Sequence, residues 1–402
     1  MDQLSEDIIV NIFSNLQAKI VLELRCICKQ WRRIINGSCF GPQLAEKHLK
    51  KGIEDPILLH HSNKPSESHD NPNNNSPYIE WEDWKDGNNS DQQSVLEINL
   101  KLFPWPSSST AKPSNKDKFL YESSASGILC FTRKTSQDDH CSKTSKPYLV
   151  NPLRKEVLEL PPLNLEPLNS SQKRYLSYGF GFDKSLRKCK VVCFVLDVSG
   201  DIVDSMIYYT LNQQKESSSS KWIQLTKSQP KCVPFPSPIC IDGVVYWSCC
   251  YDNTYMIMAF HLEKEEFRLV SLPLKLEDYS PAIFELIDLN RGVLGFADLS
   301  STNHIEIWNL NEKENWIKMY RCEVRPPYLW PNRFHPYRVL GPWKNGELLL
   351  RFLDQSIMTY NPNTNTFKYF SVPLLQEDEN TRYYSYSPSL LSLSWFQDQL
   401  LE

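Results

Sequence analysis

The chain carries little net charge, no long hydrophobic run and no basic N-terminal segment. Its formal net charge is −4 at pH 7 over 402 residues, which is too small to indicate nucleic acid or an anionic membrane surface as a partner. No run reaches the roughly 18 apolar residues that a membrane-spanning helix needs. Acidic residues come first, at Asp2, Glu6 and Asp7, so we expect no signal peptide.

The twelve cysteines are scattered and include no Cys-x-x-Cys pair. In a chain without a secretory signal, such cysteines are expected to stay reduced and to be partly buried. These features together predict a protein of the cytoplasm, the nucleus or both.

The sequence also lacks the motifs that mark common catalytic sites. It contains no Gly-x-Ser-x-Gly elbow and no glycine-rich phosphate loop. The adjacent residues His60 and His61 would point to opposite faces of a strand, which makes a poor metal site. We therefore predict no catalytic residue, no metal ligand and no cofactor.

What the sequence does contain begins with a strongly apolar helical segment. Ser5 can cap a helix, and Glu6 and Asp7 place negative charge in its first turn. About forty residues with so many large apolar side chains cannot bury them all in so small a unit. Some are expected to face another protein; the alternative is a helical hairpin that packs only on its own domain. The apolar positions are Ile8, Ile9, Ile12, Phe13 and Leu16, then Ile20, Val21, Leu22, Leu24, Ile27 and Cys28.

Residues 4–35 read LSEDIIVNIFSNLQAKIVLELRCICKQWRRII. This stretch resembles an F-box, whose usual form is Leu-Pro-x-x-(apolar), then Leu-Pro-x-(Lys), then Arg-x-x-Cys-Lys-x-Trp-Arg. Ser5 and Gln17 stand where the family has prolines. Ser5 can still cap the helix, whereas Gln17 removes a rigid turn and is expected to loosen the helix connection or weaken adaptor binding. The matching positions are Leu4, Glu6, Asp7, Ile8, Ile12, Leu16, Arg25, Cys28, Lys29, Trp31, Arg32 and Ile35.

The F-box resemblance implies a partner. F-box helices insert apolar side chains into a hydrophobic groove of a Skp-family adaptor, which connects to a cullin and a RING subunit. By this resemblance Ile8, Ile12 and Leu16 form the anchor, because central apolar residues dominate interface energetics. For Trp31 two interpretations stay open, an adaptor contact or the core of the small domain itself. The predicted adaptor contacts are Leu4, Ile8, Ile12, Leu16, Leu22, Leu24 and Trp31.

Composition predicts two domains, a helical domain over residues 1–50 and a larger one over 51–402. Asp55 and Pro56 stop the helical pattern. From 62 to 93 the composition shifts to Asn, Ser, Asp and Pro, which cannot bury enough apolar area to offset the entropy of ordering. We expect a long disordered loop over this stretch.

Beyond residue 94 a loose internal repeat occurs, with a period of about fifty residues. In each copy a glycine-centred turn leads into an apolar strand, a second strand ends in a polar turn, and a third strand follows. Stacking such sheets round an axis buries both apolar faces of each. The pattern predicts an all-β propeller of the kelch kind, with about six to eight blades, behind the small all-α domain. A β-sandwich pair or two smaller β domains are the alternatives. The glycine-centred turns begin at Ser126, Asp242, Arg291 and Asn345.

The C-terminal end of the chain is predicted to close this ring. Ser389–Leu393 reads as a strand that is too short to stand alone, and it could pair with an early strand at Ile57–His60. Leu390, Leu391 and Leu393 would then be core residues, not binding residues.

A second resemblance lies in the β region. Residues 150–163 (VNPLRKEVLELPPL), 178–183 (YGFGFD) and 243–247 (GVVYW) are similar to the F-box-associated domain of plant proteins. Behind an F-box, this domain implies a substrate receptor of an SCF-type ubiquitin ligase, which selects a protein for ubiquitination and degradation. The alternatives are a propeller enzyme, either a hydrolase or an oxidase, and a non-degradative interaction scaffold.

Substrate binding is predicted in one aromatic segment. Arg325–Phe334 combines aromatic and arginine side chains, the types enriched in binding hot spots. Within it, Trp330 and Arg333 are the predicted substrate contacts. The alternative is a loop between blades that packs on its neighbours.

Overall fold

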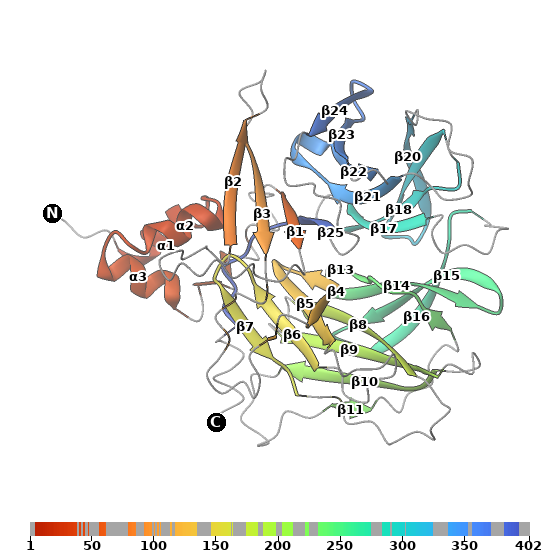
Figure 1. Ribbon diagram of the computed structural model, residues 1–402, viewed down its shortest axis with the longest axis horizontal. Coiled ribbons are helices and arrows are strands. Elements are labelled where there is room, and N and C mark those ends of the chain that lie inside the picture. The colour runs from red at the N-terminus through yellow and green to blue at the C-terminus, as the bar shows by residue number, and fades with distance from the viewer. Residues whose placement is uncertain are drawn as a thin grey trace.

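The computed structural model consists of a small helical domain followed by a ring of β-sheets (Figure 1). The residues that it describes are 5–37, 40–41, 43–44, 47, 56–61, 79–85, 92–98, 100, 103, 105, 113–114, 117–134, 146–161, 163, 174–183, 188–197, 203–211, 222–224, 232–274, 284–289, 292–301, 303–324, 337–352, 356–370 and 382–393. In this part of the chain no helix is long and apolar enough to cross a membrane.

The helical domain is built from short, tightly joined helices. Ser5 takes the N-cap position of the first one, but its side chain makes no capping hydrogen bond. Cys28 caps the third helix, because its Sγ accepts a hydrogen bond from the Trp31 amide at 3.4 Å. The described helices are α1 (Glu6–Phe13), α2 (Ala18–Leu24) and α3 (Lys29–Asn36).

The β region forms six sheets in the described residues, and each sheet is one blade of a propeller. Blade 1 contains β1 (Ile57–His61), β2 (Ile79–Lys85), β3 (Gln92–Ile98) and β25 (Arg382–Tyr386); blade 2 contains β4 (Lys118–Ala125), β5 (Ile128–Lys134), β6 (Lys146–Asn151) and β7 (Glu156–Glu159). Blade 3 contains β8 (Arg174–Asp183), β9 (Lys188–Asp197), β10 (Val203–Leu211) and β11 (Ile223–Gln224). Blade 4 contains β12 (Val233–Pro234), β13 (Ile239–Ile241), β14 (Val244–Tyr251), β15 (Thr254–His261) and β16 (Glu266–Ser271). Blade 5 contains β17 (Phe284–Leu289), β18 (Val293–Asp298), β19 (His304–Leu310) and β20 (Trp316–Glu323); blade 6 contains β21 (Tyr337–Pro342), β22 (Leu348–Phe352), β23 (Ile357–Asn361) and β24 (Thr366–Phe370).

Buried side chains from successive blades pack together all the way round the ring. Successive residues of a strand point to opposite faces, so Leu58 packs with Leu349 of blade 6, whereas Leu59 packs with Leu129 of blade 2. Apolar clusters of the same kind join blades 2 and 3, 3 and 4, 4 and 5, and 5 and 6. The ring is therefore closed with six blades, as the propeller prediction allows, and the β-sandwich alternative is wrong.

Two of the glycine-centred turns of the sequence repeat are two-residue hairpins, one between β4 and β5 and the other between β13 and β14. Both turn residues have positive φ in each case: 48° and 73° at Ser126 and Gly127, and 46° and 77° at Asp242 and Gly243. Such turns match the right-handed twist of the strands that they join. The turn at Asn345 and Gly346 is longer, because Lys344–Gly346 form a 3₁₀ helix between β21 and β22. The sequence repeat therefore reflects glycine turns of more than one kind.

The strand that closes the ring is β25, not Ser389–Leu393 as the sequence predicts. β25 pairs antiparallel with β1 along its whole length, from Ile57 opposite Tyr386 to His61 opposite Arg382. The chain end therefore closes the ring through β1, but with the residues just before the predicted strand.

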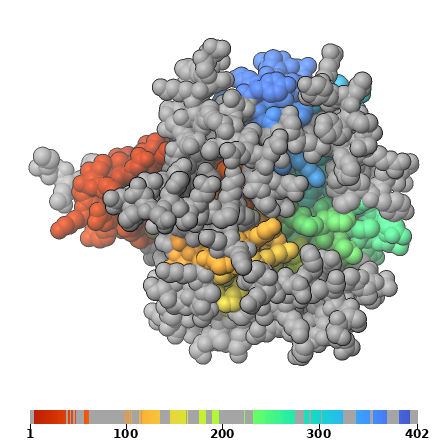
Figure 2. Space-filling model, in the orientation of Figure 1, coloured from red at the N-terminus to blue at the C-terminus, as the bar shows by residue number. Residues whose placement is uncertain are grey.

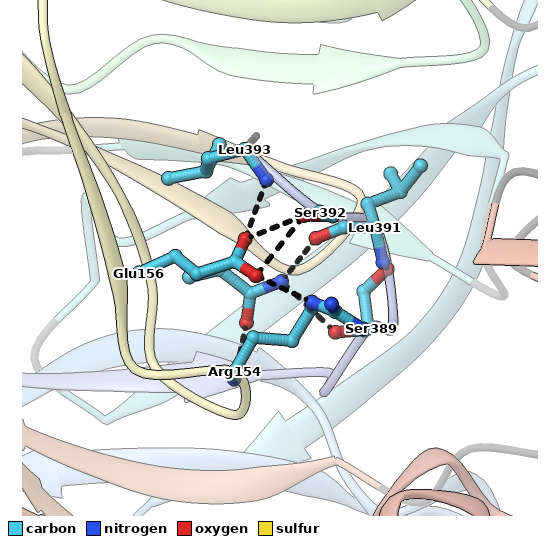
Figure 3. Close-up of polar contacts among 7 residues, drawn as sticks. Arg154, Glu156, Ser389, Leu391, Ser392 and Leu393 are labelled. Carbon is cyan, nitrogen blue, oxygen red and sulfur yellow. Dashed lines mark hydrogen bonds and ion pairs between the residues drawn. The ribbon is translucent and has the colours of Figure 1, made fainter. Parts of the chain in front are cut away.

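Residues 389–393 lie against blade 2, where side chains bind their backbone (Figure 3). Asn151 Nδ2 donates hydrogen bonds to the carbonyl oxygens of Ser389 and Leu391, at 3.0 and 2.5 Å. Glu156 Oε2 accepts from the Leu393 amide at 2.6 Å and from Ser392 Oγ at 3.0 Å. Because side chains satisfy these backbone groups, the segment needs no neighbouring strand. Its leucines are buried, as predicted: Leu390, Leu391 and Leu393.

The predicted loop over residues 62–93 is wrong for part of that stretch. β2 lies inside it and pairs with β3 from Ile79 opposite Ile98 to Lys85 opposite Gln92. Pairing with β3, the next strand along the chain, supplies the order that the composition of residues 62–93 does not indicate. Residues 62–78 and 86–91 lie outside the described part of the chain.

Candidate functional site

The first helix presents one apolar face to the domain and another to the outside. Ile9 and Phe13 are buried, whereas Ile8 and Ile12 are 48% and 47% exposed. Residues four apart lie on the same side of a helix, one turn above each other. Ile8 and Ile12 therefore form an outward apolar stripe on α1, and adjoining exposed apolar side chains are typical of an interaction surface.

The other predicted adaptor contacts are less exposed. Trp31 is half-buried and packs edge-on against Phe13, with ring centroids 5.1 Å apart at 85°. Trp31 thus contributes to the core of the helical domain, one of the two interpretations that its sequence context leaves open. Leu16, Leu22 and Leu24 are also half-buried against this core. Leu4 lies outside the described residues.

Two exposed isoleucines were not among the predicted contacts. Ile20 in the first turn of α2 is 42% exposed, and Ile27 in the turn before α3 is 63% exposed. Both belong to the second apolar run of the sequence, so the run itself is the signal for them. Helical spacing cannot find Ile27, because this residue lies between two helices.

Polar contacts hold the helices in register. Arg33 of α3 forms an ion pair with Glu6 in the first turn of α1. Both side chains are exposed, so the pair adds little stability, but it joins the two ends of the helical segment. Arg32 Nε donates a hydrogen bond to the Arg25 carbonyl at 3.4 Å. These two arginines therefore have partners within the domain.

The helical domain is attached to the propeller by an apolar junction. Phe40 and Leu44 share one buried cluster with Leu153, in the β6–β7 turn, and with Leu390 of the C-terminal segment. Gly41 lies so close that a Cβ there would meet the Leu390 carbonyl oxygen at 2.7 Å. In Figure 1 the helices lie at the left beside β2 and β7, and in Figure 2 they project from the body of the molecule.

Strand direction places this junction at one end of the ring. Neighbouring strands in blades 2 to 6 are antiparallel, so first and third strands finish at one end of the ring, with the described turns that follow them, and second and fourth strands finish at the other. Leu153 belongs to the first group. The predicted substrate contacts Trp330 and Arg333 lie outside the described residues, between Val324 and Tyr337, where the chain connects blades 5 and 6.

The two adjacent histidines of β1 pack against aromatic rings. His60 stacks on Tyr383 with ring centroids 5.0 Å apart, and His61 contacts the Phe131 ring at 4.9 Å. Among the described residues, no group of three or more His, Cys, Asp or Glu side chains could hold a metal ion.

Comparison with known families covers both domains. A model of the F-box domain matches residues 1–43, and a model of the F-box associated beta propeller domain matches residues 91–394. The second match alone covers more than half of the chain. The chain belongs to the F-box-associated propeller family.

Curated relatives include F-box proteins from Arabidopsis thaliana. F-box protein At3g07870 is 24% identical over 402 residues, which cover 92% of this chain and 87% of the relative. F-box protein At1g53790 is 24% identical over 357 residues, which cover 86% of this chain and 70% of the relative.

Solved structures resemble the propeller only distantly. The NanB sialidase from Streptococcus pneumoniae has a TM-score of 0.40 at 9% identity, over 65% of this chain and 61% of the sialidase chain. An α-L-arabinofuranosidase from Fusarium graminearum has a TM-score of 0.36 at 12% identity, over 64% of this chain and 80% of the arabinofuranosidase chain. At these scores neither likeness carries an argument about the chemistry of this chain.

The family membership supports a general role. An F-box followed by an F-box-associated propeller, together with F-box relatives, supports substrate recognition for SCF-type ligases and binding to a Skp-type adaptor. It also favours an adaptor-type protein over an enzyme.

Proposed function

We propose that this chain is the substrate-recognition subunit of an SCF-type ubiquitin ligase. Its helical domain binds a Skp-family adaptor, and through it a cullin and a RING subunit. Its propeller holds a target protein for ubiquitination and degradation. The chain itself performs no bond chemistry, because its contribution is to raise the effective concentration of target lysines near the ubiquitin donor.

The observation that carries this proposal is the exposed stripe of Ile8 and Ile12. A folded small domain with a full apolar core on one side of α1 has no internal use for two isoleucines on the other. Apolar side chains at the centre of an interface contribute most of its energy. We therefore assign the adaptor anchor to these two residues, with Ile20 and Ile27 as further candidates.

Two details extend the proposal. Target proteins bind at the end of the ring away from the helical domain, with Trp330 and Arg333 as the contacts to test first. The complex works in the cytoplasm, the nucleus or both, where reduced cysteines and ubiquitin ligases coexist.

Affinity purification from plant cells, with the proteasome blocked to retain targets, tests the proposal. The full chain is expected to bring down an adaptor and a cullin. The double variant Ile8→Asp/Ile12→Asp should lose both, because two buried carboxylates cannot be accommodated in an apolar groove. The matched control is Ile317→Asp on β20, where the isoleucine is 47% exposed.

The control variant should keep the adaptor and the cullin. Undiminished recovery of both proteins with the double variant would overturn the proposal, provided that the variant stays folded by circular dichroism.

A further inference from the structure

A cavity of about 640 Å³ opens at the end of the ring where the helical domain is attached. Its wall includes residues of β4, β13, β17, β21 and β25, so five of the six blades contribute. The hairpin at Ser126 and Gly127 and Leu44 of the helical domain border it. The volume falls within the range of roughly 300–1,000 Å³ that is typical of small-molecule sites.

Two β-bulges shape the wall of this cavity. In β20, Lys318 pairs with Trp308 and Tyr320 with Ile307, so Met319 is an extra residue without a register partner. Met319 and Tyr320 both line the cavity, although neighbouring residues of a regular strand point to opposite faces. The bulge accounts for this, since bulges re-aim side chains and are frequent beside binding sites.

The second bulge lies across the cavity in blade 6. In β21, Val339 pairs with Leu350 and Gly341 with Leu349, which leaves Leu340 as the extra residue. Val339, Leu340 and Gly341 all line the cavity. Both walls of the gap between blades 5 and 6 thus depart from regular strand geometry at the same place.

The wall carries one cationic side chain, Lys344, in the turn after β21. Lys344 is half-buried, and within the described part of the chain its ammonium group forms neither an ion pair nor a hydrogen bond. A lysine that lines a cavity without a counter-charge favours an anionic ligand there.

The one carboxylate of the described wall is differently placed. Asp288 Oδ1 accepts a hydrogen bond of 2.8 Å from the Gly292 amide, so its charge is partly compensated within the chain. The remaining wall is mixed. Its apolar part includes Leu286, Leu289, Val293, Trp343 and Leu348, and its polar part includes Ser124, Asn309 and Ser385.

We propose that this cavity binds a small molecule with an apolar body and one carboxylate, which Lys344 holds. This site does not include the adaptor stripe of Ile8 and Ile12, and it does not depend on the proposed function. Leu44 and Leu390 line the cavity and also belong to the apolar junction with the helical domain. A bound ligand therefore contacts both domains and stabilises their junction.

Matched pairs of ligands test this proposal on the full chain. The probes are 2-naphthoate with 2-naphthamide and cyclohexanecarboxylate with its carboxamide; naphthalene-2-sulfonate tests another anion. Binding is followed by saturation-transfer NMR and by the shift in melting temperature. Each carboxylate is expected to bind at least tenfold tighter than its amide and to raise the melting temperature.

Three variants locate the site. Lys344→Gln should remove the tenfold preference for the carboxylate, whereas Lys313→Gln, an exposed lysine in the β19–β20 turn, should keep it. Val293→Trp should fill the cavity and abolish binding of both members of each pair. Absence of binding to the unmodified chain, or an unchanged carboxylate preference in Lys344→Gln, would overturn the proposal.

Discussion

Neighbouring residues of α1 have opposite surroundings. Ile12 faces outward, whereas Phe13 is buried with Trp31 and Phe40, at ring-centroid distances of 5.1 and 6.2 Å. Helical spacing in the sequence predicts both apolar positions, but it cannot tell which side of the helix meets the domain. Burial in the folded chain makes that distinction.

This difference predicts opposite results for two alanine variants. Phe13→Ala should lower the free energy of unfolding by about 3–5 kcal/mol, the usual cost of removing a buried aromatic ring. Ile12→Ala should leave unfolding almost unchanged and weaken adaptor binding instead. Urea unfolding and calorimetric titration with the adaptor measure the two effects. Equal losses of stability in both variants would contradict the assignment of Ile12 to an interface.

A buried ion pair gives a second test at the residue scale. Burial raises the pKa of the Asp117 carboxyl, but hydrogen bonds from the Ser114 amide and the Arg133 guanidinium outweigh burial, and its pKa is lowered from the ordinary 3.8. The Asp117 Oδ2 atom lies 2.6 Å from Ser114 N and 3.0 Å from Arg133 Nε. A lowered folded-state pKa stabilises the protein above about pH 3.9, and this contribution is lost as the pH falls further.

Replacing Arg133 should change how the stability of the protein depends on pH. Arg133→Met leaves a buried carboxylate without its counter-charge, which is expected to cost about 3–5 kcal/mol at pH 7. The gap in melting temperature between variant and unmodified chain should narrow below pH 4, as Asp117 becomes protonated. A gap that is independent of pH would contradict the linkage.

The two-residue hairpins are the elements that can be predicted best from the sequence. Their signal is local, because a two-residue turn with positive φ favours glycine, asparagine or aspartate, as at Asp242 and Gly243, although Ser126 takes the first position of the other hairpin. Strands without such a hairpin are harder to predict. β2 has a polar neighbourhood and depends on β3, while Arg382–Tyr386 contains no leucine and is less conspicuously apolar than the leucine-rich segment that follows it.

Replacing each of the two hairpin glycines by alanine is expected to lower the free energy of unfolding by different amounts. Gly127 and Gly243 have φ of 73° and 77°, so alanine is strained at both positions. At Gly127 a Cβ would also come within 2.4 Å of the Ser389 Cβ, whereas at Gly243 no atom lies within 4 Å. Gly243→Ala should cost about 1–2 kcal/mol from backbone strain, and Gly127→Ala clearly more. Equal costs in urea unfolding would show that the C-terminal segment does not pack on blade 2.

At the scale of the whole molecule, the two ends of the β region share blade 1. β25 adds Tyr383 to the cluster in which Leu58 of β1 meets Leu349 of blade 6. The cavity is likewise a property of the closed ring, since its wall comes from strands hundreds of residues apart in sequence. No local sequence pattern could predict the cavity, because such patterns indicate only the individual strands that form its wall.

Truncation tests the closure of the ring. A chain that ends after Asn380 lacks β25 and should lose cooperative thermal unfolding, because blades 1 and 6 then expose their apolar faces. A chain that ends after Leu393 keeps every described strand and should unfold like the full chain. A cooperative transition at an unchanged temperature in the shorter chain would contradict closure through β25.

Affinity for a Skp-family adaptor is the most direct measure of whether the outward side of α1 is an interface. Isothermal titration of the full chain should give tight binding, and Ile8→Asp/Ile12→Asp should weaken it at least a hundredfold without loss of fold. Equal dissociation constants for the two chains would contradict the account.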